Sequence, residues 1–360
     1  MRGNTGRIAV VGAGIVGASI AYHLAKRGAR VTLIDAGRPG GGVTARAFGW
    51  INVSSGVAGQ CAPLRGLAIA DYHRLDAELG GALGIHWCGA LTWSADPAEA
   101  ERMVRDHAAR GHDIRLLDRA AVTRLEPGLV DVPECAAHAV GEGSLDAAVA
   151  AATLAAAARA AGAETRTGTQ VRHLEHRSGR VVGVSTDAGS IAADLVVIAA
   201  GTGAPAVCRT IGVAVPIHRS PAIRLRFRAP GPLVNGIVQG TAFEVRQPAA
   251  GTLLAAEDYI NDTAEDGPKA VAGRALTSIR AGLLGGGGLT LAETVVGVRA
   301  IPADGDPIIG RTPGIDGIYL AVMHAGVTLA PTVGRLAAAE ILGGGGEPAL
   351  DHCRPDRFTG

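Results

Sequence analysis

The first forty residues alternate between apolar runs and short polar breaks, and this pattern predicts a strand, a helix and a second strand. Residues 8–11 are four consecutive apolar residues, typical of a strand that is buried in a parallel sheet. Residues 15–27 then place apolar side chains at helical spacing, and Gly28 ends that helix. A second apolar run at 31–34 finishes with an acidic residue, Asp35. We therefore expect a strand–helix–strand unit at the start of the chain.

The turn between the first strand and the helix is rich in glycine and predicts a dinucleotide site. Gly12 permits a tight turn, Gly14 lets the backbone approach a pyrophosphate, and Gly17 lets the helix pack closely on the sheet. The free N–H groups and dipole of the helix N-terminus favour an anion there, and Asp35 falls where an acid hydrogen-bonds a ribose diol. This motif leaves FAD and NAD both open. The predicted contacts are Gly12, Ala13, Gly14, Ile15, Val16, Gly17, Asp35 and Ala36.

Helical periodicity continues after this unit. It predicts helices over 64–80, 98–110 and 270–284. The alanine-rich run from 147 to 158 is the longest apolar stretch, but Asp146 and Arg159 bound it and it is too short to span a bilayer. We interpret this run as a packed surface helix.

Strand patterns dominate two later regions. From Glu164 onward we expect a small antiparallel meander whose last strand returns to the main sheet, built from residues 164–167, 171–176, 181–186 and 190–198. The segment from 215 to 254 is again mostly strand. Five prolines in it limit these strands to short or edge positions (Pro216, Pro221, Pro230, Pro232 and Pro248).

Composition narrows the class of protein. At 360 residues, with 48% hydrophobic and 19% charged residues, the chain is globular and long enough for about two domains. A net charge of +1 and only 3% aromatic residues argue against a nucleic-acid partner. We expect no signal peptide, because the nucleotide-binding strand and helix explain the N-terminal apolar segment. A soluble, cytoplasmic protein is expected.

The five cysteines are odd in number and scattered, and none forms a CxxC pair. This pattern favours reduced thiols in a cytoplasm over a disulfide framework or a zinc site. His86 and Cys88 lie close together but have no second ligand pair nearby, so we expect a packed strand there and no metal.

Two further segments suit a cofactor. Residues 43–52 combine small residues, a hydroxyl and an arginine, which suits a path along phosphates, although an ordinary capped helix start explains them equally well. Near the C-terminus, a strand-like run at 293–300 contains Arg299, and residues 323–331 lead into a helix that ends at Leu342. A strand–glycine–helix junction so late in the chain indicates a second set of backbone N–H groups aimed at the cofactor.

These motifs, in this order, resemble the FAD-dependent amino-acid oxidase and dehydrogenase family of glycine oxidase, sarcosine oxidase and the D-amino-acid dehydrogenases. Two motifs near the C-terminus are the specific part of the resemblance. The first comprises residues 297–299 and 304–310, and the second runs from His324 to Pro331. The resemblance covers nearly the whole chain and is closest to the glycine oxidase type. It favours FAD over NAD.

The resemblance implies an α/β fold with a Rossmann-like FAD-binding domain that is discontinuous in sequence. That domain would comprise residues 1–80, 140–205 and 295–360. Residues 81–139 and 206–294 would form a substrate domain with a mainly antiparallel sheet.

Residue roles follow from the same resemblance. Arg299 corresponds to the arginine that binds the substrate carboxylate, and Val171 to the residue whose backbone meets adenine. His324, with Tyr259 and Phe243, would shape the pocket, although a packed core histidine is an equally good reading. The remaining implied cofactor contacts are Thr44, Ala45, Arg46, Ala47, Gly49, Trp50, Ala200, Gly201, Arg299, Ala325, Gly326, Val327, Thr328 and Leu329.

The chain departs from some relatives in two ways. It has no cysteine just before Arg299, where some sarcosine oxidases attach FAD, so we expect non-covalent FAD. It also lacks the lysine that those enzymes use with oxygen, since its two lysines are Lys26 and Lys269 and the matching region holds Asn261 and Asp262. The electron acceptor could thus be oxygen, a quinone or another carrier.

The implied reaction is hydride transfer from the substrate Cα–H to flavin N5, which gives an imine and then an oxo acid plus an amine or ammonia. Bound flavin carries the electron chemistry and the protein supplies binding and orientation. Two other classes stay open at this point. One is an NAD-linked dehydrogenase, and the other is a dehydrogenase subunit or tailoring enzyme that acts on an unusual amine. A homo-oligomer is possible.

Overall fold

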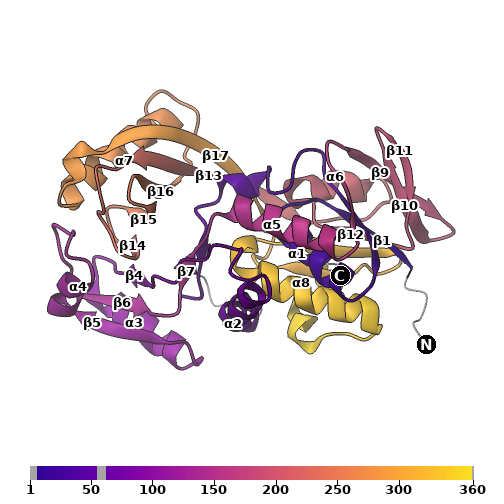
Figure 1. Ribbon diagram of the computed structural model, residues 1–360, viewed down its shortest axis with the longest axis horizontal. Coiled ribbons are helices and arrows are strands. Elements are labelled where there is room, and N and C mark those ends of the chain that lie inside the picture. The colour runs from indigo at the N-terminus through magenta and orange to yellow at the C-terminus, as the bar shows by residue number, and fades with distance from the viewer. Residues whose placement is uncertain (1–5, 55–61, 359–360) are drawn as a thin grey trace.

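The computed structural model describes residues 6–54 and 62–358 and contains two large sheets (Figure 1). One is six-stranded, in the order β18-β19-β12-β1-β2-β8, and the other is eight-stranded, in the order β17-β13-β16-β15-β14-β4-β6-β5. Helices α1, α5 and α8 lie with the six-stranded sheet, and α7 covers the far end of the eight-stranded one. The α/β fold class predicted from the sequence is confirmed.

The six-stranded sheet grows from the N-terminal unit. Its strands are parallel except β18, which runs antiparallel to β19. Ile8 and Val10 of β1 face one hydrophobic cluster while Ala9 and Val11 face another, so this strand is buried on both faces, as its continuous apolar run predicts. The strands are β1 (Arg7–Val11), β2 (Arg30–Ile34), β8 (Glu164–Arg166), β12 (Leu195–Ile198), β18 (Ile308–Arg311) and β19 (Ile318–Val322).

Small residues let the helices approach this sheet and one another. Helix α1 (Ile15–Lys26) packs against both α5 (Ala147–Ala160) and α8 (Gly326–Gly343). A Cβ on Gly334 of α8 would lie 2.2 Å from Ser19 Oγ of α1, so only glycine fits at this crossing. The Asp146 side chain caps α5 by accepting from the N–H groups of Ala148 and Val149.

One strand prediction is wrong. Residues 164–166 do not join the meander. They form β8, which pairs parallel with β2, and the preceding helix α5 provides the crossover that a parallel strand requires. The meander that remains, in the order β11-β10-β9, consists of β9 (Val171–Arg177), β10 (Arg180–Thr186) and β11 (Gly189–Ala192).

The eight-stranded sheet is antiparallel except between β14 and β4. One of its faces packs a hydrophobic core against α7 (Pro268–Gly282). Its strands are β17 (Thr290–Pro302), β13 (Ile217–Arg228), β16 (Thr252–Asp258), β15 (Glu244–Ala249), β14 (Ile237–Gln239), β4 (Ala90–Thr92), β6 (Cys135–Ala139) and β5 (Ile114–Asp118). The other elements are α2 (Ala62–Glu78), α3 (Pro97–Ala108), α4 (Arg119–Leu125), α6 (Ala204–Arg209), β3 (Trp50–Ile51), β7 (Gly143–Ser144) and the 3₁₀ turns η1 (Val43–Arg46), η2 (Gly201–Gly203), η3 (Gly286–Gly288), η4 (Pro348–Cys353) and η5 (Pro355–Phe358).

Strand β13 corrects a second expectation. It is twelve residues long and lies inside the sheet although it contains Pro221, which predicted a short or edge strand. Pairing with β16 begins only at Ala222, so Pro221 has a strand neighbour on one side, at Val298 of β17. A proline can occupy such a position because its missing N–H faces no partner strand.

The cysteines follow the prediction only in part. Cys88, Cys135 and Cys208 are free, whereas Cys353 is disulfide-bonded. Cys61 lies outside the described residues. The expectation of a reduced thiol is therefore wrong for Cys353, because spacing along the chain does not show which residues the fold brings together. Within residues 6–54 and 62–358, no helix has the length and apolar character needed to cross a membrane.

Candidate active site

A cavity of about 1260 Å³ opens where the carboxyl ends of β1, β2 and β12 meet one face of the eight-stranded sheet. Ligands of open α/β sheets bind at this edge of the strands. Most of the residues predicted for the site line it: Gly12, Gly14, Ile15, Val16, Asp35, Ala36, Thr44, Arg46, Ala47, Gly49, Trp50, Val171, Ala200, Gly201, Phe243, Arg299, His324, Ala325, Gly326, Val327 and Thr328.

Five predicted residues are not among those that line the cavity: Ala13, Gly17, Ala45, Leu329 and Tyr259. The first four are neighbours of lining residues on the same turns. Tyr259 follows β16 and packs against the apolar core of the eight-stranded sheet, which explains why it does not reach the cavity.

The glycine turn has the close contacts that its sequence predicts. Gly12 has a φ of +101°, and a Cβ there would lie 2.4 Å from the Ala199 carbonyl oxygen. A Cβ on Gly17 would lie 1.9 Å from the Gly12 carbonyl oxygen, so the first turn of α1 presses on the end of β1. Side chains at either position would push helix and strand apart. The cradle therefore presents bare backbone to the cavity.

Polar contacts fix the edges of this cradle. Asp35 accepts from the Ala13 N–H at 2.7 Å and from the Gly37 N–H at 2.8 Å, which ties the tip of β2 to the glycine turn. The Ile15 N–H donates to Thr44 Oγ1 at 3.3 Å, which joins the start of α1 to η1. A carboxylate has about four lone-pair sites, so Asp35 retains acceptor capacity for a ribose diol.

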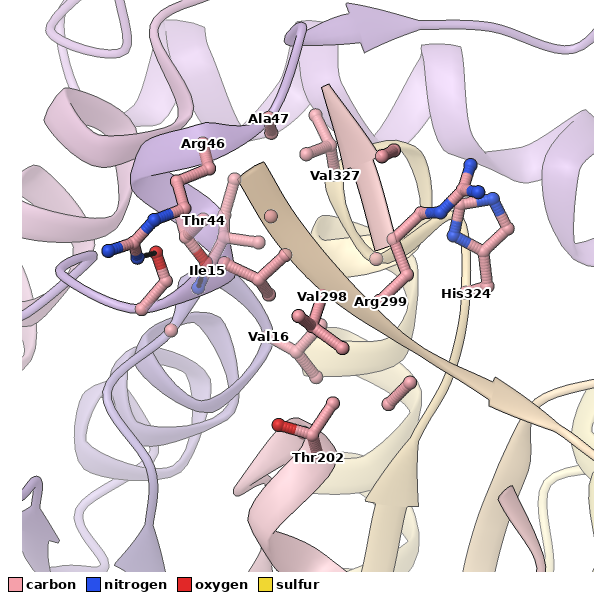
Figure 2. Close-up of a pocket in the computed structure, with 18 of the residues that line it drawn as sticks. Ile15, Val16, Thr44, Arg46, Ala47, Thr202, Val298, Arg299, His324 and Val327 are labelled. Carbon is pink, nitrogen blue, oxygen red and sulfur yellow. Dashed lines mark hydrogen bonds between the residues drawn. The ribbon is translucent and has the colours of Figure 1, made fainter. Parts of the chain in front are cut away.

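Arg299 lies at the other end of the cavity. It extends from β17 opposite Ser220 of β13. Its Nη2 donates to Ser220 Oγ at 2.8 Å and its Nε donates to the Ser220 carbonyl at 3.4 Å. Figure 2 shows its guanidinium beside the ring of His324, with Thr44 and Arg46 on the opposite side of the pocket.

His324 is neutral at pH 7. The residue is exposed to the open cavity, but protein atoms surround its ring on the other sides. This partial desolvation, together with the charges of Arg299 and Arg65, lowers the pKa of His324 to about 4. The next residue, Ala325, has a φ of +64° at the start of α8. This left-handed conformation is disfavoured by roughly 1–2 kcal/mol for a residue other than glycine. The residues that follow Ala325, namely Gly326, Val327 and Thr328, line the cavity.

Sequence reasoning missed several lining residues on the eight-stranded sheet and on α2. Glu244 of β15 accepts from Gln239 Nε2 at 2.9 Å, and burial raises its pKa to about 7. Arg224 of β13 donates to the Ala45 carbonyl at 3.1 Å and to Glu293 at 2.9 Å, so it ties η1 to this sheet. Arg65 lies on α2 and also lines the cavity. Arg224 and Glu244 both pair with Ala256 of β16, so their side chains lie on the same face of the sheet. The alternation of residues along each strand could not show this, because it does not give the register between strands.

The residues present fit a dinucleotide with a redox ring. Bare glycine backbone and a helix N-terminus can hold a pyrophosphate near α1. The cavity then continues to the start of α8 and Arg299. In the described part of the chain, no three His, Cys, Asp or Glu side chains form a group that could hold a metal ion.

Comparison with known proteins agrees with this geometry. The profile of the DAO family, FAD dependent oxidoreductase, matches residues 7–340. Glycine oxidase from Geobacillus kaustophilus is 28% identical over 349 residues, which cover 92% of this chain and 91% of that protein. A D-amino acid dehydrogenase from Xanthobacter autotrophicus is 27% identical over 412 residues, covering 96% and 97%.

The fold agrees as well. The crystal structure of glycine oxidase from Geobacillus kaustophilus superposes with a TM-score of 0.87 at 25% identity and covers 99% of this chain and 100% of that one. The family profile spans both sheets, and it decides between the two dinucleotides that the first motif left open. The chain belongs to the family of FAD-dependent oxidoreductases.

Proposed function

We propose that this enzyme oxidises a small amino acid or N-alkyl amino acid at its C–N bond, to an imine and then an oxo acid plus amine or ammonia. The observation that carries the proposal is Arg299, whose guanidinium faces the cavity beside a neutral histidine. A guanidinium matches a carboxylate in a two-point contact and stays charged when partly buried. The relatives named glycine oxidase and D-amino acid dehydrogenase support this substrate class.

In this proposal the chain binds and orients the substrate. Ser220 holds one edge of Arg299, so the guanidinium presents its remaining N–H groups to the carboxylate in a fixed direction. His324 adds no charge and leaves Arg299 as the binding cation beside it. FAD, when bound, supplies the acceptor for the two electrons and the hydrogen that leave the carbon next to nitrogen.

The cofactor is non-covalent in this proposal. Cysteine is absent from the described residues that line the cavity, so no thiol stands ready to attach the flavin. The division into an FAD domain (1–80, 140–205 and 295–360) and a substrate domain (81–139 and 206–294) belongs to the same proposal, as does a cytoplasmic location.

A second candidate function is a dehydrogenase subunit or tailoring enzyme that passes electrons to an acceptor other than oxygen. The observation that favours it is the position of the two lysines. Neither Lys26, on α1, nor Lys269, on α7, is among the residues that line the cavity. An oxidase of the sarcosine type would need such a lysine near the flavin.

Anaerobic flavin reduction tests both candidates. We expect the flavin bands of the purified holoenzyme to bleach with at least one of glycine, sarcosine, D-alanine, D-proline or L-proline. Air then separates the candidates, since an oxidase recovers its colour within seconds and a dehydrogenase needs a quinone or dye. Bands that no amino acid bleaches would contradict the proposed substrate class.

A further inference from the structure

The eight-stranded sheet presents one face to the cavity, and the side chain of Glu244 lies on that face. Glu244 of β15 pairs with Ala256 of β16, which pairs in turn with Arg224 of β13. Residues opposite one another in a sheet share a face, as do residues two apart along a strand. Arg299 shares this face, because its partner Ser220 lies an even number of residues before Arg224 on β13. One sheet face therefore brings a carboxylate and the proposed carboxylate-binding arginine to a single cavity.

Hydrogen bonds hold the carboxylate of Glu244 in place. Gln239 Nε2 donates to Glu244 Oε2 at 2.9 Å, and Thr92 Oγ1 donates to Gln239 Oε1 at 3.5 Å. The threonine contact sets the direction of the amide, so that its NH₂ group faces the carboxylate. Glu244 is half-buried, and both it and Gln239 line the cavity. One oxygen of Glu244 is therefore anchored, and the carboxylate keeps acceptor capacity for a ligand.

The arginines that share this face are bound elsewhere. Arg224 forms an ion pair with Glu293, at 2.9 Å. Arg246, two positions further along β15, donates to two backbone carbonyl oxygens and to Ser144 Oγ. In the part of the chain that the structure describes, no lysine, arginine or histidine forms an ion pair with Glu244. The chain thus leaves this carboxylate without a counter-charge.

The surroundings of Glu244 favour a cation from the ligand. Burial raises the pKa of Glu244 to about 7, the carboxylates of Glu257 and Asp258 act in the same direction, and the hydrogen bond from Gln239 opposes them. A partly buried carboxylate is costly to keep charged unless a cation pairs with it. A positively charged group in the cavity would supply that pairing.

We propose that Glu244 determines substrate specificity by binding a positive group at the end of the substrate remote from its carboxylate, so that the substrate is an amino acid with a basic side chain. This inference rests on the proposed function, in which Arg299 binds the carboxylate. Strands β13 and β16 lie between the two residues, and small side chains at Ala222 and Ala256 line the cavity there. An α-ammonium group is bonded next to the carboxylate, so the side-chain cation is the group that spans this separation.

Equilibrium binding to the oxidised holoenzyme tests the subsite without catalysis. The probes are ε-aminocaproate and heptanoate, which have the same chain length and one carboxylate each, but only the first has an ammonium group at its far end. Titration calorimetry at about pH 8.5, above the pKa of Glu244, measures both affinities. We expect ε-aminocaproate to bind about tenfold to hundredfold more tightly, as one charge-assisted hydrogen bond gives.

Glu244→Gln should remove this preference and leave the affinity for heptanoate unchanged. The glutamine keeps an oxygen that can accept from Gln239, so the hydrogen bond that anchors the side chain is retained. Glu265→Gln is the matched control, because it removes the same charge at an exposed position that is not among the cavity residues. We expect this control to keep the preference for ε-aminocaproate.

The reductive half-reaction gives a second comparison. Arginine should bleach the flavin at lower concentration than citrulline of the same chirality, because citrulline has nearly the same shape and no side-chain charge. Glu244→Gln should cancel this difference, and Glu265→Gln should keep it.

Three results would overturn the subsite. One is equal affinity for ε-aminocaproate and heptanoate in the unmodified enzyme, which includes the absence of binding heat with either. Another is a loss of both affinities together in Glu244→Gln. The third is an equal loss of flavin reduction by arginine and citrulline in that variant, which would assign Glu244 to the α-amino group. Arg299→Gln separates the two proposals, because the proposed function requires this variant to weaken both probes whether or not Glu244 distinguishes them.

Discussion

Arg299 Nη2 donates to Ser220 Oγ at 2.8 Å, across the register of β17 and β13. The same serine accepts from Arg299 Nε through its carbonyl oxygen at 3.4 Å. These two bonds hold one edge of the guanidinium against the sheet, so the strand pairing itself sets the direction in which Arg299 faces the cavity. The register between β17 and β13 therefore fixes the orientation of the Arg299 guanidinium.

Ser220→Ala removes the side-chain bond and leaves the carbonyl contact. We expect KM for the preferred amino acid to rise about fivefold, since a neutral hydrogen bond contributes roughly 1 kcal/mol. Ser220→Thr keeps the hydroxyl and should stay near the original KM. Steady-state kinetics with quantified flavin content measure both. Equal KM values for the alanine and threonine variants would show that the hydroxyl does not position Arg299.

The pH dependence of stability contains a contribution from His23 of α1. The ring is 5% exposed, and burial lowers its pKa to about 3 from 6.5. The unfolded chain binds a proton below pH 6.5 while the folded protein does not. This contribution is therefore complete above pH 6.5 and declines as pH falls towards 3, by at most about 1.4 kcal/mol per pH unit.

His23→Leu should flatten this decline. Denaturant unfolding at pH 6.5 and 4.5 should show the variant losing about 2 kcal/mol less stability than the original protein over that interval. His218→Leu, at an exposed position of β13, is the control and should follow the original curve. Parallel curves for the original protein and His23→Leu would contradict the assignment.

Gly17→Ala tests the glycine cradle. Its Cβ would lie 1.9 Å from the Gly12 carbonyl oxygen, so α1 must shift away from β1. We expect weaker FAD retention on gel filtration and a lower Tm. Gly273→Ala is the control, because this exposed position in α7 has open space around it and the change should stabilise by about 0.5–1 kcal/mol. Full FAD retention by Gly17→Ala would argue against the cradle.

Glu142→Gln tests the buried carboxylate behind Trp50. The carboxylate accepts from Trp50 Nε1 and from two backbone N–H groups, and an amide has only one oxygen to accept with. We expect a loss of about 1–3 kcal/mol in unfolding free energy. Glu134→Gln on the surface should leave stability unchanged. A thermal melt of the holoenzyme compares them, and equal Tm values would mean that the network is unimportant.

The sequence was most informative where chemistry is local. The glycine turn, Asp35 and the His324 turn are short motifs whose residue types already specify a backbone shape, and all of them line or border one cavity. The resemblance to a family of FAD enzymes is confirmed by the family profile.

The predictions that failed depend on contacts between residues that are far apart in the sequence. Glu164–Arg166 has strand character in either sheet, and only the α5 crossover decides that it pairs with β2. In the sequence, Arg65 is a polar residue on an ordinary helix, and only the packing of α2 against α8 shows that it lines the cavity. Tyr259 lies next to cavity residues in sequence, but it is only half-buried and packs against the core of the eight-stranded sheet.

The most direct test of the central claim compares an amino acid with its own carboxamide. The unmodified holoenzyme and Arg299→Gln are each mixed anaerobically with the amino acid that bleaches the flavin and, separately, with its amide. We expect the original enzyme to prefer the acid by about a hundredfold, as a charge-assisted two-point contact allows, and Arg299→Gln to treat both alike. Equal reduction by acid and amide in the original enzyme would contradict carboxylate binding by Arg299.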